Sequence, residues 1–582
     1  MPSELDRMME AGVARLTAPG APLALGMIER DGVTLPMIAT APPALPHYFA
    51  HFCAEHTDKT FLVAGAERLT FGAVYAEARR VAAALVDGFG VERGDRVGIA
   101  MRNSPSWIVL YMGALMAGGV ATLLNGWWSP EELAEAIADV DCRLVFADPP
   151  RADRLAQVAG LACRVVAIDD RPPLDEALAP VTTHGGSADT PLPEMTGDDH
   201  ATILFTSGST GRSKGALSDH RAVVQGVFSF LTQALVMLGI ATESGHPPEG
   251  QPATLLAIPL FHVTGEIPIM LQSFAMGRKL VVMPKWDAEE AMRLIEAEAI
   301  TYFVGVPLMS YEILNHPNRH KYDLSKVTDL AAGGAPRPVE HVRRIAEEMG
   351  GSAPLIGYGL TETNAVGCGN WRDNYLAKPD STGAASRPLV EVAIVDAAGR
   401  PVAQGERGEI GIRTICNFTR YWNRPDDTAA AFTADRFFLT GDIGYLDEDG
   451  YLFIVDRKKD IIIRGGENIS CQEVEAAIYR HPAVAECAVF GLPDARLGEV
   501  PGAVVHYRPG EALGNEDLCT FLGRHIAAFK LPARMWVSPE PLPRLGTEKI
   551  DKVALRNRYR ALAAAEAASA AFPAQEVRGT LP

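Results

Sequence analysis

The feature that most constrains this fold is the alternation of short β-rich runs with amphipathic helical stretches from about residue 96 onward. The runs predicted as strands are 96–101, 120–125, 143–148, 164–168, 201–206, 254–260 and 301–306. Between two of them, Ser129-Pro130-Glu131-Glu132 supplies an N-cap, a first-turn proline and a capping-box glutamate for a helix to about Val140. A second helix is predicted over 287–297. Such alternation is typical of α/β layers with largely parallel strands.

The C-terminal part of the chain has a different pattern. After about residue 384 the runs shorten and turn-forming tracts multiply (DAAGRP, RPDDT, DEDGY), which predicts an antiparallel, distorted barrel-like part. A smaller α+β unit begins near Asp456, with a predicted helix over 516–529 and an Ala-rich tail. We therefore predict a large N-terminal domain over residues 1–458 and a small, mobile C-terminal domain over 459–582.

Composition excludes several classes of protein. The formal net charge of −18 opposes a nucleic-acid surface, and the eight cysteines contain no C-x-x-C pair that would indicate zinc or redox chemistry. The N-terminus lacks the apolar stretch of a secretory signal, which predicts a cytoplasmic protein. Residues 223–241 approach membrane-spanning length, but Gln225, Thr232 and Gln233 interrupt them. A buried core helix is the preferred interpretation, and no transmembrane segment is expected.

The loop after the predicted strand 201–206 is the strongest candidate for chemistry. It reads Thr206-Ser207-Gly208-Ser209-Thr210-Gly211-Arg212-Ser213-Lys214-Gly215. Glycines let the backbone curl, hydroxyls add donors and Lys214 adds charge, which suits a polyphosphate. Ser213 precedes the lysine where a Walker A motif has glycine. A plain Gly/Ser-rich surface loop and a serine hydrolase using Ser213 in a G-x-S-x-G elbow remain alternatives, the latter remote because six loop residues separate Phe205 from Arg212.

Five further motifs follow in order along the chain. They are Ala332-Gly333-Gly334-Ala335-Pro336, Gly357-Tyr358-Gly359-Leu360-Thr361-Glu362-Thr363, Thr440-Gly441-Asp442, Asp456-Arg457-Lys458-Lys459-Asp460 and Gly465-Gly466-Glu467-Asn468. With the Thr206–Gly215 loop, this series resembles the acyl-adenylate-forming superfamily of acyl-CoA synthetases, adenylation domains and beetle luciferases. The resemblance spans about residues 48–555.

The resemblance implies an ATP site. Its expected residues are Thr206, Ser207, Gly208, Ser209, Thr210, Gly211, Lys214, Gly333, Gly334, Ala335, Gly357, Tyr358, Gly359, Thr361, Asp442, Arg457 and Lys549. Glu362 matches the magnesium ligand, and a carboxylate oxygen is a ligand that Mg²⁺ prefers. Small residues at 333–335 would let adenine lie against the backbone, and Tyr358 offers a ring for stacking. Asp442 and Arg457 are expected to contact the ribose.

The same comparison assigns the second half of the reaction. Lys459 matches a hinge about which the small domain swings, and Arg464, Gly465, Gly466 and Glu467 match a coenzyme A contact. Lys549 matches the lysine that bridges the substrate carboxylate and the adenosine. Glu548 stands where the family usually has glycine, so a nearby negative charge could pair with Lys549. The expected catalytic residues are Lys549, His262, Thr361 and Lys214.

The implied acyl pocket is mainly apolar. It comprises Phe261, His262, Glu266, Val304, Val306, Gly333, Gly359, Asn364 and Val366. The sequence therefore predicts an acid–CoA ligase that uses ATP, Mg²⁺ and coenzyme A on a fatty or aromatic acid, with a homodimer as a candidate assembly. Transfer of the acyl group to a carrier-protein thiol or an amine is the main alternative. A noncatalytic nucleotide-binding relative is a further one.

Overall fold

A computed structural model describes residues 3–206, 213–335, 337–349, 351–458, 460–464, 467–494, 496–545 and 549–571. The chain forms two compact units. The larger contains residues 1–440 and 445–453, and the smaller contains residues 441–444 and 454–582.

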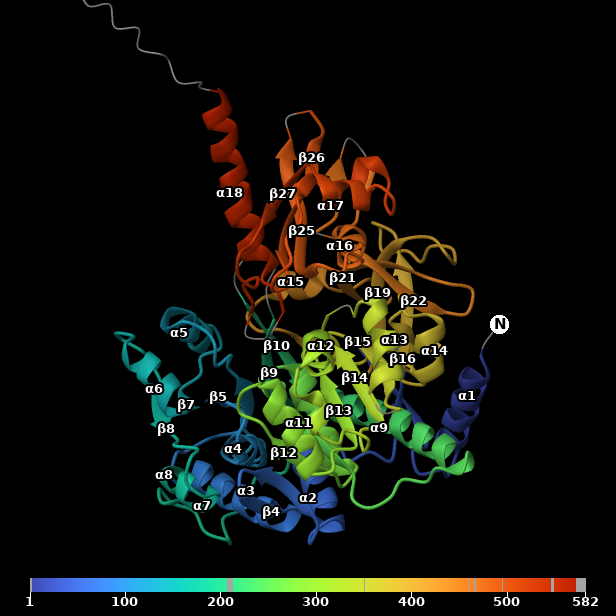
Figure 1. The fold of residues 1–582 in the computed structure, drawn as a ribbon. Helices are drawn as coiled ribbons and strands as arrows, with labels where there is room; N and C mark the ends of the chain where they lie inside the picture. Colours follow the sequence, from blue (N-terminus) through green and yellow to red (C-terminus); the bar gives the residue numbers. More distant parts are fainter. Residues whose placement is uncertain are drawn as a thin grey trace, which may run out of the picture. The chain divides into compact units, whose positions relative to one another are not determined.

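The first sheet of the larger unit has seven strands (Figure 1). In spatial order they are β20 (Arg420–Tyr421), β10 (Lys214–Asp219), β9 (His200–Thr206), β6 (Val120–Leu123), β5 (Arg96–Ala100), β7 (Leu144–Ala147) and β8 (Arg164–Ala167). The strands β5 to β9 pair in parallel, as the alternating pattern predicted. The sequence did not predict β10 and β20, which add antiparallel to the β9 edge.

The second sheet has thirteen strands. In spatial order they are β18 (Val390–Val395), β19 (Gly408–Thr414), β21 (Phe438–Leu446), β22 (Tyr451–Arg457), β17 (Gly383–Ala385), β16 (Gly367–Trp371), β15 (Ala353–Gly359), β14 (Asp329–Gly333), β13 (Tyr302–Gly305), β11 (Ala253–Leu256), β12 (Lys279–Val282), β3 (Thr60–Ala64) and β4 (Glu67–Thr70). Pairing is parallel from β3 to β15 and antiparallel from β15 to β17 and between β18 and β19. The antiparallel part thus begins before residue 384 and continues the parallel sheet. A separate hairpin joins β1 (Leu25–Arg30) and β2 (Val33–Ile38).

The helices of the larger unit begin where the sequence supplies caps. They are α1 (Glu4–Thr17), α2 (Leu45–Glu55), α3 (Phe71–Asp87), α4 (Pro105–Met116), α5 (Pro130–Asp139), α6 (Pro149–Ala156), α7 (Leu174–Ala177), α8 (Ala179–Thr182), α9 (His220–Glu243), η1 (Gly265–Leu271), α10 (Gln272–Ala275), α11 (Ala288–Ala297), α12 (Pro307–Asn315), η2 (Arg319–Lys321), α13 (Val339–Glu348), η3 (Thr361–Thr363), α14 (Arg372–Ala377) and α15 (Pro425–Ala430). The predicted capping box is confirmed at α5. The Ser129 hydroxyl accepts from the Glu132 N–H at 3.2 Å, and the Glu132 carboxylate accepts from the Ser129 N–H at 2.8 Å. Such a cap stabilises a helix by about 1 kcal/mol.

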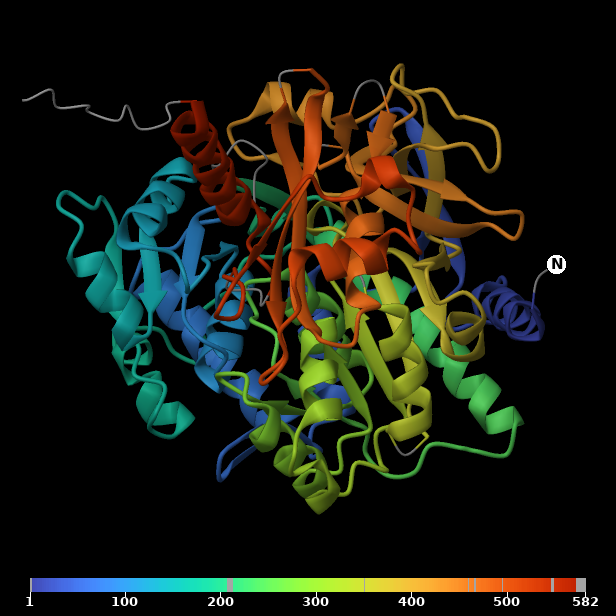
Figure 2. The same cartoon turned by 45° about the horizontal axis from the view of Figure 1, so that its top comes forward.

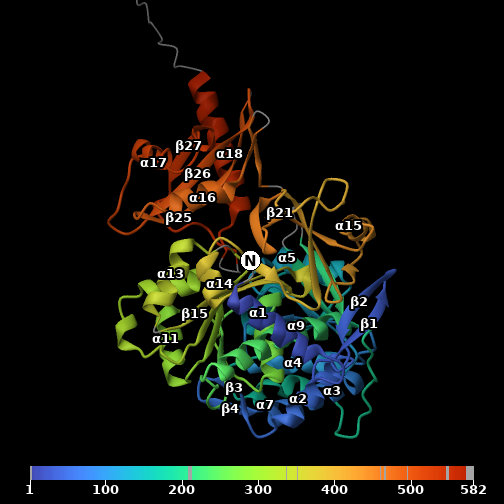
Figure 3. The same cartoon turned by 90° about the vertical axis from the view of Figure 1, so that its right-hand side faces the viewer.

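Helix α9 contains the long apolar segment. In the described part of the chain it is the one helix whose length and composition would suit a membrane span, but 61% of its most apolar window is buried within the protein. Helix α1 lies alongside it (Figure 3). A Cβ at Gly12 would come within 2.9 Å of the Val236 side chain, so this close approach depends on glycine. The burial agrees with the predicted core helix.

The smaller unit is built on a five-stranded sheet (Figure 2). Its strands are β23 (Ile462–Arg464), β24 (Glu467–Ile469), β25 (Val484–Asp494), β26 (Gly498–Tyr507) and β27 (Arg534–Val537), and its helices are α16 (Cys471–Tyr479), α17 (Asn515–Leu522), η4 (Ala528–Lys530) and α18 (Lys552–Ala571). Alternate residues of β25 and β26 face two separate cores. One core includes α16 and α17, and the other includes α18.

The predicted helix over 516–529 was too long. Helix α17 ends at Leu522, where the Gly523 N–H donates to the Cys519 carbonyl at 2.9 Å, and a separate short turn forms η4. Glycine is a poor helix former and favours a helix end.

Candidate active site

The predicted phosphate loop connects two paired strands of the seven-stranded sheet. Thr206 ends β9, and Lys214 begins β10 directly opposite it in the antiparallel register. The predicted residues Ser207, Gly208, Ser209, Thr210 and Gly211 lie outside the described residues, as does Arg212. The chain after Ser213 continues as a strand, whereas a nucleophile elbow turns from a strand into a helix. The strand therefore gives the hydrolase interpretation no support.

Lys214 has two partners that the sequence did not predict. Its Nζ lies 2.9 Å from Oδ2 of Asp427, which is on α15. The same Nζ lies 5.1 Å from the centre of the Tyr421 ring. The side chain of Lys214 is mostly buried and that of Asp427 is partly exposed. A cation is thus held at the end of the loop by a carboxylate and an aromatic face.

Glu362 approaches the same tyrosine from a different sheet. It lies in η3, one residue after Thr361, and is buried. The Tyr421 hydroxyl donates to Glu362 Oε1 at 2.7 Å, and the Phe418 N–H donates to the Glu362 carbonyl at 2.7 Å. Burial and the adjacent Glu362 charge raise the pKa of Tyr421, so its hydroxyl stays protonated as the donor.

Two residues of the predicted acyl pocket flank η3. Asn364 adopts a left-handed conformation with φ of 50°, and its Nδ2 donates to the Cys416 carbonyl at 2.8 Å and to Ser218 Oγ at 3.0 Å. Its side chain is fully occupied in holding the turn against β10. Val366 is buried two residues later.

The glycine-rich motifs lie at the carboxyl ends of two parallel strands. Gly333 ends β14 opposite Gly357 in β15, and Tyr358 and Gly359 complete β15. Ligands of open parallel sheets bind at this edge. Gly334 has φ of 77°, which favours glycine, and Ala335 follows it. A Cβ at Gly359 would come within 2.1 Å of the Ala365 carbonyl oxygen, so glycine is required there.

The other predicted acyl-pocket residues lie on the segment around η1 and on β13. The Phe261 and His262 rings are 4.5 Å apart, and the His262 carbonyl accepts from the Glu266 N–H at 3.0 Å. Phe261 is buried, as are Val304 and Val306 at the end of β13. Apolar side chains therefore surround the histidine.

Glu266 is a fully buried carboxyl group in the π-helix η1. The Tyr111 hydroxyl of α4 donates to its Oε1 at 2.7 Å, and its Oε2 has no hydrogen-bond partner among the described residues. Burial raises the pKa of Glu266 to about 8, although the Tyr111 hydrogen bond opposes this shift. The group is therefore protonated near neutral pH. π-Helical turns often occur at functional sites.

The smaller unit brings together three predicted residues. Asp442 is buried in β21, and its Oδ1 lies 3.3 Å from Nε of Arg457 at the end of β22. The Lys549 carbonyl accepts from the Leu545 N–H at 2.8 Å, which closes the turn that presents Lys549. Burial and the neighbouring Arg457 lower the pKa of Lys549 to about 8, while Asp442 acts in the opposite direction.

The predicted coenzyme A segment is described only in part. Arg464 ends β23 and pairs in register with Glu467 at the start of β24. Gly465 and Gly466, between them, and the hinge candidate Lys459 lie outside the described residues, and so does the Glu548 side chain.

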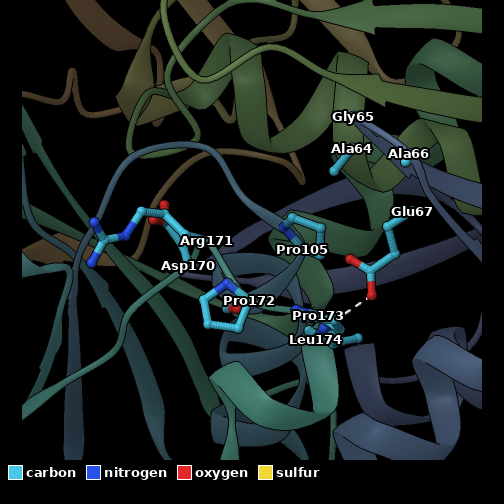
Figure 4. Close-up of a pocket in the computed structure, with 11 residues that line it drawn as sticks. Ala64, Gly65, Ala66, Glu67, Pro105, Asp170, Arg171, Pro172, Pro173 and Leu174 are labelled. Carbon is cyan, nitrogen blue, oxygen red and sulfur yellow. Dashed lines mark hydrogen bonds between the residues drawn. The ribbon is translucent and has the colours of Figure 1, made fainter.

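A hollow of about 310 Å³ lies away from all these residues (Figure 4). The Glu67 carboxylate accepts from the Leu174 N–H at 2.9 Å there, which caps the first turn of α7. Its lining residues are Ala64, Gly65, Ala66, Glu67, Pro105, Ser106, Asp170, Arg171, Pro172, Pro173 and Leu174. None of the predicted site residues is among them.

Sequence reasoning missed three residues in contact with predicted ones. Tyr421 and Asp427 lie around the tract RPDDT, which the sequence indicated only as a turn. Tyr111 lies in the apolar helix α4. An aromatic residue close to a Pro-Asp-Asp tract was the available signal for the first two, and nothing local distinguished Tyr111.

Comparison with known proteins gives the family. Residues 49–422 match the model of the AMP-binding enzyme, and residues 473–549 match that of the AMP-binding enzyme C-terminal domain. The chain belongs to the AMP-binding enzyme family. The resemblance inferred from the motifs is therefore confirmed.

Three relatives illustrate the similarity. The chain is 30% identical over 557 residues to a long-chain-fatty-acid–CoA ligase of Bacillus subtilis, covering 88% of this chain and 96% of the relative. It is 33% identical over 494 residues to a feruloyl-CoA synthase of an Amycolatopsis species, covering 83% and 94%. The structure of o-succinylbenzoate coenzyme A synthetase from Bacillus subtilis in complex with ATP and magnesium ion matches with a TM-score of 0.74 and 25% identity, covering 89% of this chain and 100% of that one. These matches confirm the α/β fold with a large and a small unit.

Proposed function

We propose that this AMP-binding enzyme is an ATP-dependent carboxylic acid–CoA ligase. It forms an acyl-adenylate and pyrophosphate in the first half-reaction, and acyl-CoA and AMP in the second. The observation that carries the proposal is the pairing of a buried carboxylate, Glu362, with a cation, Lys214, through one tyrosine beside a hydroxyl-rich loop. A carboxylate beside a cation suits a magnesium-bound polyphosphate.

In the first half-reaction the substrate carboxylate attacks the α-phosphorus of ATP. Lys214 stabilises the leaving pyrophosphate, and Thr361 and the loop residues Thr206 to Gly211 add phosphate contacts. Glu362 would hold Mg²⁺, which when bound neutralises phosphate charge. The residues present fit a hard cation, because Glu362 offers a buried carboxylate oxygen with its charge close to Lys214.

The nucleoside contacts divide between the two units. Gly333, Gly334, Ala335, Gly357, Tyr358 and Gly359 form an open strand-end surface suited to a flat adenine ring. Asp442 and Arg457 bind the ribose, and Lys549 stabilises the charge that develops during adenylation.

The second half-reaction transfers the acyl group to a thiol. Arg464, Gly465, Gly466 and Glu467 would pass the pantetheine arm of coenzyme A, since residues without a Cβ leave room for a narrow channel. Lys459 is the proposed hinge of the smaller domain, and His262 flanks the substrate carboxylate. A cytoplasmic location and a homodimer stay predictions from the sequence.

The acyl substrate is proposed to be a fatty or aromatic acid. Phe261, Val304, Val306 and Val366 are buried and apolar, which favours an apolar tail. Relatives named for long-chain fatty acids and for ferulate lie at similar identity, so both classes belong in a substrate panel.

The decisive experiment measures two products. A panel of fatty and aromatic acids is incubated with ATP and Mg²⁺, with and without coenzyme A. Acid-dependent exchange of pyrophosphate into ATP, plus thioester formed only with coenzyme A, is the expected result. Exchange without thioester would indicate a carrier-protein or amine acceptor. Absence of exchange with every acid would indicate a noncatalytic relative and overturn the proposal.

A further inference from the structure

The segment from β20 to α15 joins two parts of the proposed nucleotide site that are far apart in sequence. Its strand pairs with β10, so that Tyr421 lies opposite Ala216, and the Trp422 N–H donates to the Gly215 carbonyl at 2.7 Å. Lys214 is the residue before Gly215. The segment is therefore fixed directly beside the lysine.

The opposite side of the segment is fixed to Glu362. The Phe418 N–H and the Tyr421 hydroxyl both donate to this glutamate, one to its carbonyl and one to its carboxylate. Tyr421 is 9% exposed and packs with Phe418 and Phe438, so its ring has little freedom to turn. One rigid side chain thus contacts both the predicted metal ligand and the predicted phosphate-binding lysine.

Helix α15 is held in the same way. The Thr428 hydroxyl accepts from the Tyr421 N–H at 3.0 Å, and Arg424 Nη2 lies 2.7 Å from Asp139 Oδ1. These bonds place Asp427, which precedes Thr428, within 2.9 Å of the Lys214 ammonium. The local charges then run carboxylate, ammonium, carboxylate through Asp427, Lys214 and Glu362, with the tyrosine between the last two.

From this geometry we propose that Tyr421 and Asp427 are positioning residues for the Mg²⁺–ATP complex. The hydroxyl of Tyr421 orients the Glu362 carboxylate toward the metal, and its ring face holds Lys214 close by. Asp427 is a counter-ion that Lys214 exchanges for phosphate when ATP binds. The proposal rests on the proposed adenylation function and adds how its two charged groups are aligned.

A hydrogen bond to a charged group is stronger than a neutral one, which sets the expected size of the tyrosine effect. Tyr421→Phe keeps the ring, its packing and its contact with Lys214, and removes only the hydroxyl. The Mg²⁺ concentration for half-maximal acid-dependent pyrophosphate exchange should rise about five- to tenfold. Thioester formation from preformed adenylate should stay unchanged, because that step uses neither ATP nor pyrophosphate.

The matched control is Tyr451→Phe. Tyr451 donates a hydrogen bond of the same length, 2.7 Å, to the Asp6 carboxylate, away from these residues. Its loss should leave the Mg²⁺ dependence unchanged. An unchanged Mg²⁺ dependence in Tyr421→Phe, or equal losses in both half-reactions, would overturn the positioning role.

Asp427→Asn tests the counter-ion. A partly exposed ion pair contributes little, so freeing Lys214 should lower the KM for ATP by about two- to fivefold, with the Mg²⁺ dependence unchanged. Asp426→Asn, an exposed neighbour on α15, is the control and should leave the KM unchanged. An increased KM in Asp427→Asn would refute the exchange. If the unaltered protein shows no acid-dependent exchange, the proposed function itself fails, which is a different result from a failure of either variant.

Discussion

The buried carboxyl group of Glu266 makes a prediction that depends only on the fold. Its pKa is raised from 4.5 to about 8 by burial, so the folded protein keeps a proton that the unfolded chain releases above pH 4.5. Stability from this group is therefore complete below about pH 4.5 and is lost as pH rises toward 8. Retaining the proton costs about 3 kcal/mol at pH 7.

Glu266→Gln removes the titration and keeps the acceptor for the Tyr111 hydroxyl. The amide leaves a buried N–H without a partner, which gives a penalty that does not change with pH. The difference in free energy of unfolding between the variant and the unaltered protein should therefore shift in favour of the variant by about 2 kcal/mol from pH 6 to pH 8. For a chain of this size, that corresponds to a change of a few degrees in the difference between melting temperatures.

The assay compares melting curves of the two proteins at pH 6, 7 and 8 in buffers of equal ionic strength. Glu249→Gln, an exposed glutamate in the loop after α9, is the control and should show no pH-dependent difference. A constant difference between Glu266→Gln and the unaltered protein across this range would show that Glu266 is already ionised at pH 6. The burial argument would then be refuted.

Three further outcomes are expected. Adenylation should decline as pH rises through about 8, because Lys549 loses the charge that the first half-reaction needs; in Lys549→Arg the decline of kcat/KM should move to higher pH, and an unmoved limb would assign it to another group. Gly359→Ala should lower the free energy of unfolding by about 1–3 kcal/mol in urea titrations, because its Cβ would clash with a carbonyl oxygen, whereas Gly333→Ala, whose Cβ meets nothing nearer than 3.6 Å, should not. Glu362→Gln should reduce pyrophosphate exchange by more than tenfold at low Mg²⁺, with partial recovery at high Mg²⁺ and an unchanged second half-reaction.

Local patterns predicted the parts of the fold that local physics determines. The buried strands of the seven-stranded sheet and the Ser129 cap follow from apolar runs and hydrogen-bonding side chains that are adjacent in sequence. The edge strands β10 and β20 were not predictable in this way. They are short, and they exist because residues far apart in the chain pair with each other.

The candidate site shows the same division. Motifs identified Lys214 and Glu362 separately, but neither predicts that one tyrosine contacts both. Asn364 was expected at the acyl pocket on resemblance, and only the structure shows that its side chain bonds to Ser218 and the Cys416 carbonyl. Glu266 appeared as a polar exception in an apolar list, and its raised pKa depends on burial that sequence does not encode locally.

The two-faced sheet of the smaller unit has a practical consequence. Because β25 and β26 bury one set of side chains against α16 and α17 and the alternate set against α18, this segment supplies both of its own hydrophobic cores. Residues from about 454 onward should consequently fold when expressed alone, and they offer a cassette for exchange with the corresponding part of a relative. Chimeric enzymes could then separate what each unit contributes to turnover.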